Sequence, residues 1–126
     1  MADKTRIETD SLGTIEIPAD RYWGPQTERA RQLFRIGGQR FPPELIRAVG
    51  LHKLACAEAN AELGELPANL VAPIRQAAQE IADGNRYDEF PLPVWQTGSG
   101  TQTNMNANEV IANRANEILG HLSLED

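Results

Sequence analysis

The sequence has little of what disulfide, thiol and metal chemistry need: one cysteine, two histidines and 6% aromatic residues in 126 positions. A lone cysteine excludes an internal disulfide, and Cys56 lies among alanines in a helical pattern, so we expect a small core residue rather than a catalytic thiol. The two histidines, His52 and His121, are not spaced as metal ligands, and the acidic residues are dispersed. We therefore predict no metal site, and we expect His52 to be a surface or packing residue.

Long hydrophobic runs and clusters of basic residues are also missing. No stretch approaches about 18 apolar residues, and the first six residues lack an apolar run and carry an acid that a transit peptide would avoid. We therefore expect a cytoplasmic protein with no membrane partner. The twelve Lys and Arg residues are scattered and the net charge is -6, which argues against a nucleic-acid partner. A chain of 126 residues predicts a single domain over 1–126.

Hydrophobic periodicity predicts a mainly α-helical fold. Four helices are expected, over residues 25–34, 43–63, 67–83 and from 103 or 104 to 119. Gly64, Gly84 and Gly120 follow the last three of them, where a glycine in the left-handed conformation ends a helix. Gly50, inside the second helix, is a weak point because glycine is a poor helix former.

The remaining segments are expected to be extended. The first seventeen residues alternate polar and apolar positions around Ser11–Gly13, which predicts a short hairpin or an extended arm that Pro18 ends. Two prolines bracket Leu92, so the segment 85–96 cannot continue a helix. The two tryptophans are expected to be core or interface anchors, Trp23 and Trp95.

The segment 97–109 reads TGSGTQTNMNANE and places small hydroxyls, amides and two glycines directly before a helical pattern. Glycine lets a ligand approach the backbone, and the unpaired N–H groups at a helix start favour an anion. Ser99, Thr101 and Thr103 add hydroxyl donors. The segment therefore indicates a pocket for a carboxylate or phosphate, although its first four residues also suit a plain capped loop.

Nucleotide-binding motifs do not fit this segment. A phosphate-binding P-loop has a Lys after its second glycine, whereas Gly100 is followed by Thr101 and Gln102. A dinucleotide-binding turn needs a third glycine and a preceding buried strand, whereas position 103 is Thr103 and two prolines precede the segment.

Asparagines are unusually frequent in the last predicted helix, and they include those at 104, 106, 108 and 113. Because asparagine is a poor helix former, we expect these side chains to serve another purpose. For Asn104 and Asn106 two interpretations remain open, namely a substrate-site role and a role in capping or bonding neighbouring helices.

The run QTGSGTQTNMNANEVIANR, from Gln96 to Arg114, resembles the first signature region of the class II fumarases, within the fumarase and aspartase superfamily of homotetrameric lyases. The segments 6–13 and 19–27 resemble the opening of the same family, and the similarity extends from about Thr5 to Gly120. Aspartases share the general pattern, but Ser99, Gln102 and the segment RYWGPQT are fumarase-like. Residues 121–126 depart from the pattern of the family.

The resemblance implies the helical N-terminal domain of a homotetrameric fumarate hydratase, which interconverts fumarate and L-malate without a metal or an organic cofactor. Ser99 and Thr101 are then donors to a substrate carboxylate, and Gly100 allows close approach with its N–H available. Thr103, Asn104 and Asn106 are possible supporting residues.

No catalytic residue is expected in this chain. The family's water-activating His, its Ser-rich loop, its substrate-binding Lys and Asn and its long central helices have no counterpart here, so the chain resembles an N-terminal domain separated from its helical bundle. We therefore expect negligible activity alone. Two other interpretations remain: the corresponding domain of an aspartase-like ammonia lyase, since an amine and a water leave the same kind of carbanion, and a non-catalytic assembly fragment.

Overall fold

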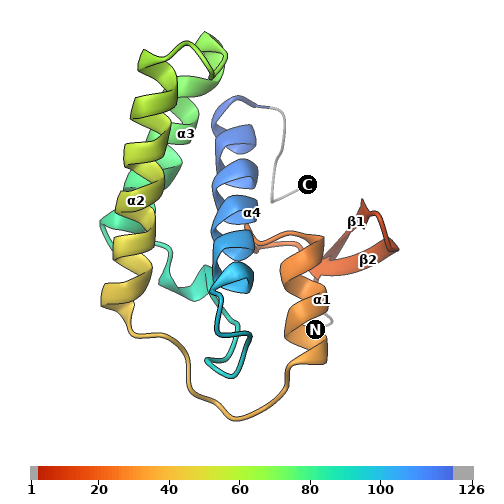
Figure 1. The fold of residues 1–126 in the computed structure, drawn as a ribbon. Coiled ribbons are helices and arrows are strands. Elements are labelled where there is room, and N and C mark those ends of the chain that lie inside the picture. The colour runs from red at the N-terminus through yellow and green to blue at the C-terminus, as the bar shows by residue number, and fades with distance from the viewer. Residues whose placement is uncertain (1–2, 121–126) are drawn as a thin grey trace.

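The computed structural model describes residues 3–120, and within them a hairpin precedes four helices (Figure 1). The elements are β1 (Thr5–Asp10), β2 (Gly13–Pro18), α1 (Pro25–Leu33), α2 (Pro43–Glu62), α3 (Ala68–Ala82), the short 3₁₀ helix η1 (Tyr87–Glu89) and α4 (Thr101–Ile118). The prediction of a mainly α-helical fold with an N-terminal hairpin is confirmed. The divergent segment 121–126, with His121, lies outside the described residues.

The hairpin is antiparallel and is attached to α1 by an ion pair. Thr5 stands opposite Pro18 and Asp10 opposite Gly13, so only two residues form the turn. Arg29 of α1 donates from Nε and Nη2 to the two carboxylate oxygens of Asp10, each over 2.9 Å. These hydrogen bonds lower the pKa of the Asp10 carboxyl. The hairpin is therefore held against α1 at its turn end.

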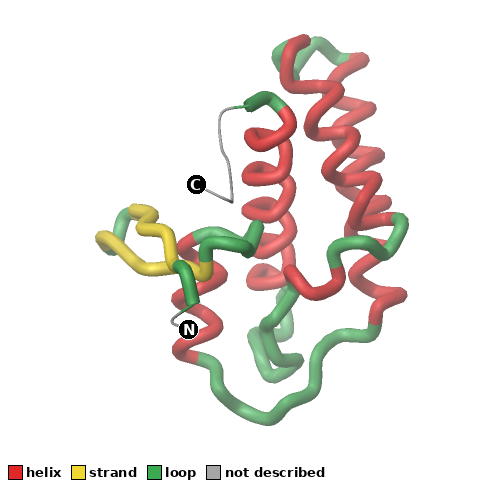
Figure 2. The backbone as a smooth tube through the Cα atoms, turned by 180° about the vertical axis from the view of Figure 1, so that it is seen from behind, coloured by secondary structure: helices red, strands yellow, loops and turns green. Residues whose placement is uncertain are grey.

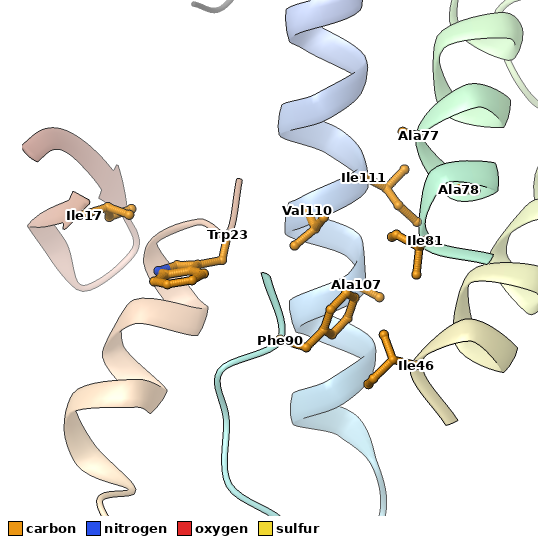
Figure 3. Close-up of a cluster of buried hydrophobic side chains, with 10 residues drawn as sticks. All are labelled: Ile17, Trp23, Ile46, Ala77, Ala78, Ile81, Phe90, Ala107, Val110 and Ile111. Carbon is orange, nitrogen blue, oxygen red and sulfur yellow. The ribbon is translucent and has the colours of Figure 1, made fainter. Parts of the chain in front are cut away.

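Helix α4 is the central element, with α3 on one side and α1 on the other, and α2 packs on α3 (Figures 1 and 2). Buried side chains from the hairpin, α4 and the segments between them form the core cluster shown in Figure 3: Ile17, Trp23, Ile46, Ala77, Ala78, Ile81, Phe90, Ala107, Val110 and Ile111. No helix within residues 3–120 combines the length and the apolar character that crossing a bilayer requires.

Two contacts fix the helices closely together. At Gly50 an added Cβ would lie 2.5 Å from the backbone nitrogen of Ala82, so the glycine that weakens α2 by itself also lets α3 approach it. Glu109 of α4 accepts hydrogen bonds at the start of α1 from Gln26 N (3.1 Å), Thr27 N (2.8 Å) and Thr27 Oγ1 (2.6 Å). A carboxylate from α4 thus caps α1, whose own N-terminal residues supply no side-chain cap.

Three expectations differ from the structure. Helix α4 begins at Thr101, two residues before the earliest predicted start, because Gly100 takes a φ of 77° and turns the chain directly into the helix. The segment predicted to be extended contains η1, which is held where Tyr87 Oη donates to Phe41 O over 2.6 Å. Cys56, expected to be a core residue, is only half-buried. Of the two tryptophans, expected as core or interface anchors, Trp23 lies in the core and Trp95 is 57% exposed.

Candidate functional site

The segment predicted to bind an anion forms an exposed turn at the start of α4. Gly100 precedes the helix in the left-handed region of φ, which favours glycine. Ser99, Gly100 and Thr101 are all exposed, and no atom lies within 4 Å of the place where a Gly100 Cβ would stand. A ligand therefore has free access to the backbone here.

Three hydroxyls gather on this turn. Thr97 Oγ1 lies 2.9 Å from Ser99 Oγ, and Thr101 Oγ1 lies 3.2 Å from Ser99 Oγ and 3.4 Å from Thr97 Oγ1. Each hydroxyl has one donor and two acceptor directions, so all three can turn toward a shared acceptor. Thr103, the other predicted hydroxyl donor, instead donates to Gln96 Oε1 over 3.4 Å.

The backbone at the start of α4 offers further donors. The first hydrogen bond of the helix runs from Asn104 N to Gly100 O over 3.1 Å. Among residues 3–120, the N–H groups of Thr101, Gln102 and Thr103 have no partner. Unpaired N–H groups at a helix start carry a partial positive charge and stabilise an anion. No charged residue occurs in the sequence from Phe90 to Asn108, so no carboxylate within this segment opposes the effect.

A groove of about 460 Å³ lies beside the turn, between α2 and the start of α4. Its lining residues are Phe41, Leu45, Ala48, Val49, His52, Lys53, Gly100, Thr103 and Asn104. Lys53 Nζ donates to Asn104 Oδ1 over 2.5 Å and brings an ammonium group next to the first turn of α4. Sequence reasoning missed Lys53, because a single lysine on a helix 51 positions away from Asn104 carries no local signal.

The structure places Asn104 and Asn106, whose roles the sequence did not decide, in different surroundings. Asn104 is exposed at the rim of the groove, bonded to Lys53. Asn106 is 1% exposed, and its Nδ2 donates to the backbone oxygen of Glu89 over 2.9 Å. Its amide therefore holds η1 against α4 and is already occupied.

Two further polar groups near α4 are buried. Glu89 accepts a hydrogen bond from Tyr22 N over 2.7 Å, with Arg21 Nη1 at 3.6 Å; burial raises the pKa of its carboxyl, and these partners offset part of that effect. The side-chain oxygen of Gln102 is buried and finds no hydrogen-bond donor among residues 3–120. Buried polar atoms nearly always have a hydrogen-bond partner, so we expect this oxygen to accept a hydrogen bond from another segment or from water.

A larger hollow, about 1030 Å³, lies between the hairpin and α1, away from the turn. Two of the arginines that line it already have partners, since Arg31 donates to Glu28 over 2.8 Å and Arg21 faces Glu89. The unpaired N–H groups and the clustered hydroxyls lie at the start of α4, beside the groove, and we therefore treat the groove and the turn as the candidate site.

Comparison with known proteins supports the resemblance seen in the sequence. A family profile described as "Lyase" matches residues 13–126. The chain is 64% identical over 116 residues to a protein named fumarate hydratase class II 2 from Bradyrhizobium diazoefficiens, covering 92% of this chain and 24% of that protein. It is 61% identical over 117 residues to the fumarate hydratase class II of Thermus aquaticus, covering 91% and 25%.

Solved structures give the same result. The class II fumarase of Schistosoma mansoni superposes with a TM-score of 0.89 at 39% identity, covering 94% of this chain and 25% of that chain. A protein of Brucella melitensis titled fumarate lyase:delta crystallin superposes with a TM-score of 0.87 at 47% identity, covering 93% and 28%. The chain thus spans about a quarter of the length of the relatives it matches. Because the profile covers most of its residues, the chain belongs to the lyase family, and the relatives it matches there are class II fumarate hydratases.

Proposed function

We propose that this chain is the part of a class II fumarate hydratase that anchors a substrate carboxylate during the reversible hydration of fumarate to L-malate. Ser99 and Thr101 donate their hydroxyls, and Gly100 gives access to the backbone. The observation that carries the proposal is that three clustered hydroxyls and three unpaired N–H groups meet at one helix start, in a chain of the lyase family. A small dicarboxylate offers this cluster a compact negative charge.

The chemistry explains why such donors are useful. Dehydration of L-malate removes a weakly acidic proton next to a carboxylate, and the resulting carbanion is stabilised when its charge spreads onto that carboxylate. Donors fixed before the reaction stabilise this charge without reorganisation. The turn itself carries only hydroxyls and amides, so it binds and polarises the substrate, and the groups that move protons belong to other segments.

We further propose that these segments belong to the rest of a longer chain and to neighbouring subunits of a homotetramer. Two observations support this. Large apolar side chains remain exposed on several elements: Leu33, Ile36, Leu45, Leu51, Leu63 and Trp95. The buried side-chain oxygen of Gln102 also lacks a hydrogen-bond donor within the described part of the chain. Apolar exposure of this kind is typical of surfaces that another protein segment covers.

The proposal is tested with Thr101→Val in a complete enzyme that contains this segment. Valine keeps the shape of threonine and removes the hydroxyl, and a hydrogen bond to a charged group contributes about 1.5–3 kcal/mol. We expect kcat/KM for L-malate to fall by about tenfold to a hundredfold. Thr14→Val is the matched control, because Thr14 is exposed on the hairpin far along the chain from the turn, and it should leave kcat/KM unchanged.

Wild-type kcat/KM in the Thr101→Val enzyme would refute the role of this hydroxyl. The 126-residue chain alone, added to fumarate, should leave the absorbance of fumarate constant, and steady turnover would show that it holds its own proton-transfer groups. Aspartate is assayed in parallel with the complete enzyme, because the turn itself does not distinguish loss of water from loss of ammonia.

A further inference from the structure

A separate hollow of about 290 Å³ lies at the long loop that joins α1 to α2 (Figure 1), where this loop faces the segment before α4. Three arginines line it, Arg31, Arg35 and Arg40, and none of its lining residues is acidic. The hollow shares no lining residue with the groove beside α4, and it contains no residue of the turn at 97–101. The proposed function therefore does not use it.

Positive charge is concentrated at this loop. Residues 29–43 read RARQLFRIGGQRFPP and contain four arginines and no acidic residue, although the whole chain carries a net charge of -6. The twelve basic residues are thus scattered over the chain as a whole but gathered here. Arg31 is paired with Glu28 over 2.8 Å, whereas Arg35 and Arg40 form no ion pair among residues 3–120. Two guanidinium groups of the hollow therefore have no carboxylate partner in the described part of the chain.

Arg40 is held in place by its neighbours. Its guanidinium carbon lies 4.5 Å from the centre of the Tyr87 ring, and Nη1 donates to Phe90 O over 3.4 Å. The adjoining residue of the loop, Gln39, accepts a hydrogen bond through its backbone oxygen from Val94 N over 2.9 Å. These contacts attach the loop to the segment before α4 and keep the guanidinium group of Arg40 at the hollow. A ligand thus meets a donor that is already positioned.

We infer that this hollow binds the phosphate group of a small ligand, with Arg35 and Arg40 as its main contacts. The planar guanidinium group matches a pair of phosphate oxygens, and hydrogen bonds between charged groups are stronger than those between neutral groups. A phosphate group carries a charge of about -1.5 to -2 at neutral pH, which two guanidinium groups neutralise. The N–H groups of Gly37 and Gly38 have no partner among residues 3–120, and successive N–H groups in a turn are suited to an anion.

The size of the hollow restricts the ligand. A volume of about 290 Å³ is at the small end of ligand-binding cavities, so it suits one phosphate group with at most a small organic group. Phe34, Pro91 and Pro93 add apolar surface that such an organic group can contact. Inorganic phosphate and a phosphate monoester share the group that the arginines bind, and the experiment distinguishes them.

The experiment is a titration of the 126-residue chain with inorganic phosphate and with n-butyl phosphate, followed by tryptophan fluorescence. The indole nitrogen of Trp95 lies 3.2 Å from the place where a Cβ on Gly37 would stand, so an anion in the hollow should change the emission of Trp95. We expect saturation with both probes and weaker binding at high salt, because salt screens exposed charges. Tighter binding of n-butyl phosphate identifies a monoester as the ligand, and equal affinities identify free phosphate. Isothermal titration calorimetry repeats the measurement independently of the indole, and no saturable signal by either method would overturn the inference.

Variants separate the hollow from a general effect of charge. Arg35→Gln should weaken the binding of both probes by at least about tenfold, since hydrogen bonds to charged groups contribute this much. Arg47→Gln is the matched control, because it removes the same charge from an exposed side chain of α2 that does not line the hollow, and it should bind nearly as the wild type does. Circular dichroism confirms that each variant keeps its helices. Wild-type affinity in Arg35→Gln, or an equal loss in Arg47→Gln, would contradict the assignment.

The turn at 97–101 also offers donors to an anion, so a third variant separates it from the hollow. Thr101→Val removes a hydroxyl of the turn and leaves the arginines unchanged, and its affinity for both probes should equal that of the wild type. Lost affinity in Thr101→Val together with wild-type affinity in Arg35→Gln would place the phosphate at the turn and overturn the inference. The proposed role of the turn in carboxylate binding does not depend on this result.

Discussion

The substitution Gly50→Ala tests how closely α2 and α3 pack. In an isolated helix this change stabilises by about 1 kcal/mol, because alanine is the better helix former. In this protein, however, the new Cβ would lie 2.5 Å from Ala82 N, 2.7 Å from Ile81 Cγ2 and 2.8 Å from Ile81 Cβ. A backbone nitrogen and a Cβ cannot swing aside as the end of a long side chain does. The two helices must therefore move apart.

The clash decides the sign of the effect. Inserting a methyl group into a packed core costs about 1–3 kcal/mol, and the upper part of this range applies where backbone must move. Ile81 is 1% exposed, so the movement also disturbs the core. A strain of about 3 kcal/mol, less about 1 kcal/mol gained in helix propensity, leaves a net loss of about 2 kcal/mol in the free energy of unfolding.

For a chain of this length, an unfolding entropy of about 2.1 cal/mol/K per residue converts this loss into a Tm about 8 °C lower. Thermal unfolding followed by circular dichroism measures the shift. Gly38→Ala is the matched control, since nothing lies within 4 Å of its Cβ position and its φ is not positive; its Tm should stay the same or rise slightly. A Gly50→Ala protein as stable as the wild type would refute the close approach of the helices.

Two further predictions concern polar contacts of α4. Asn106→Ala leaves the buried backbone carbonyl of Glu89 without its hydrogen-bond donor, and it should lower the free energy of unfolding by about 1–3 kcal/mol. Urea denaturation measures this loss, and an unchanged free energy of unfolding would contradict a structural role for the Asn106 amide. For Glu80, burial acts to raise the pKa, but hydrogen bonds from Arg114 and Arg86 outweigh it and hold the pKa of the carboxyl below 4.5. A carboxyl whose pKa is lowered by folding stabilises the protein above its unfolded pKa and loses this contribution as the pH falls through its folded pKa. The difference in the free energy of unfolding between the wild type and Glu80→Gln should therefore be largest near neutral pH and shrink as the pH falls below about 4.5. Urea denaturation at several pH values measures this difference. A difference that stays constant with pH would refute the role of the ion pairs.

Local sequence signals accounted for most of the secondary structure. The second helix was predicted over 43–63 and spans Pro43–Glu62, because a proline starts it and Gly64 follows its end with a φ of 72°. The start of α4 was placed too late because polar residues with low helix propensity follow Gly100. The helix tolerates them since its buried face, with Ala107, Val110 and Ile111, packs in the core.

The candidate site was predicted only in part, and for a physical reason. Glycines and hydroxyls in a short run predict unpaired donors at a helix start, because the donors depend on neighbouring residues alone. The partners of Asn104 and Asn106 could not be predicted in this way. Lys53 is 51 positions away from Asn104, and the carbonyl of Glu89 reaches Asn106 only because η1 folds back on α4.

The sequence by itself therefore determined the family, the order of hairpin and helices and the composition of the turn at 97–101, since each follows from local backbone preferences or from a contiguous pattern. Tertiary structure alone decided which side chains meet across elements: Lys53 with Asn104, Asn106 with η1, and Glu109 with the start of α1. These contacts depend on how each helix is rotated and how closely it packs on its neighbours. Hydrophobic periodicity specifies a buried face, but it does not specify which neighbour lies against it.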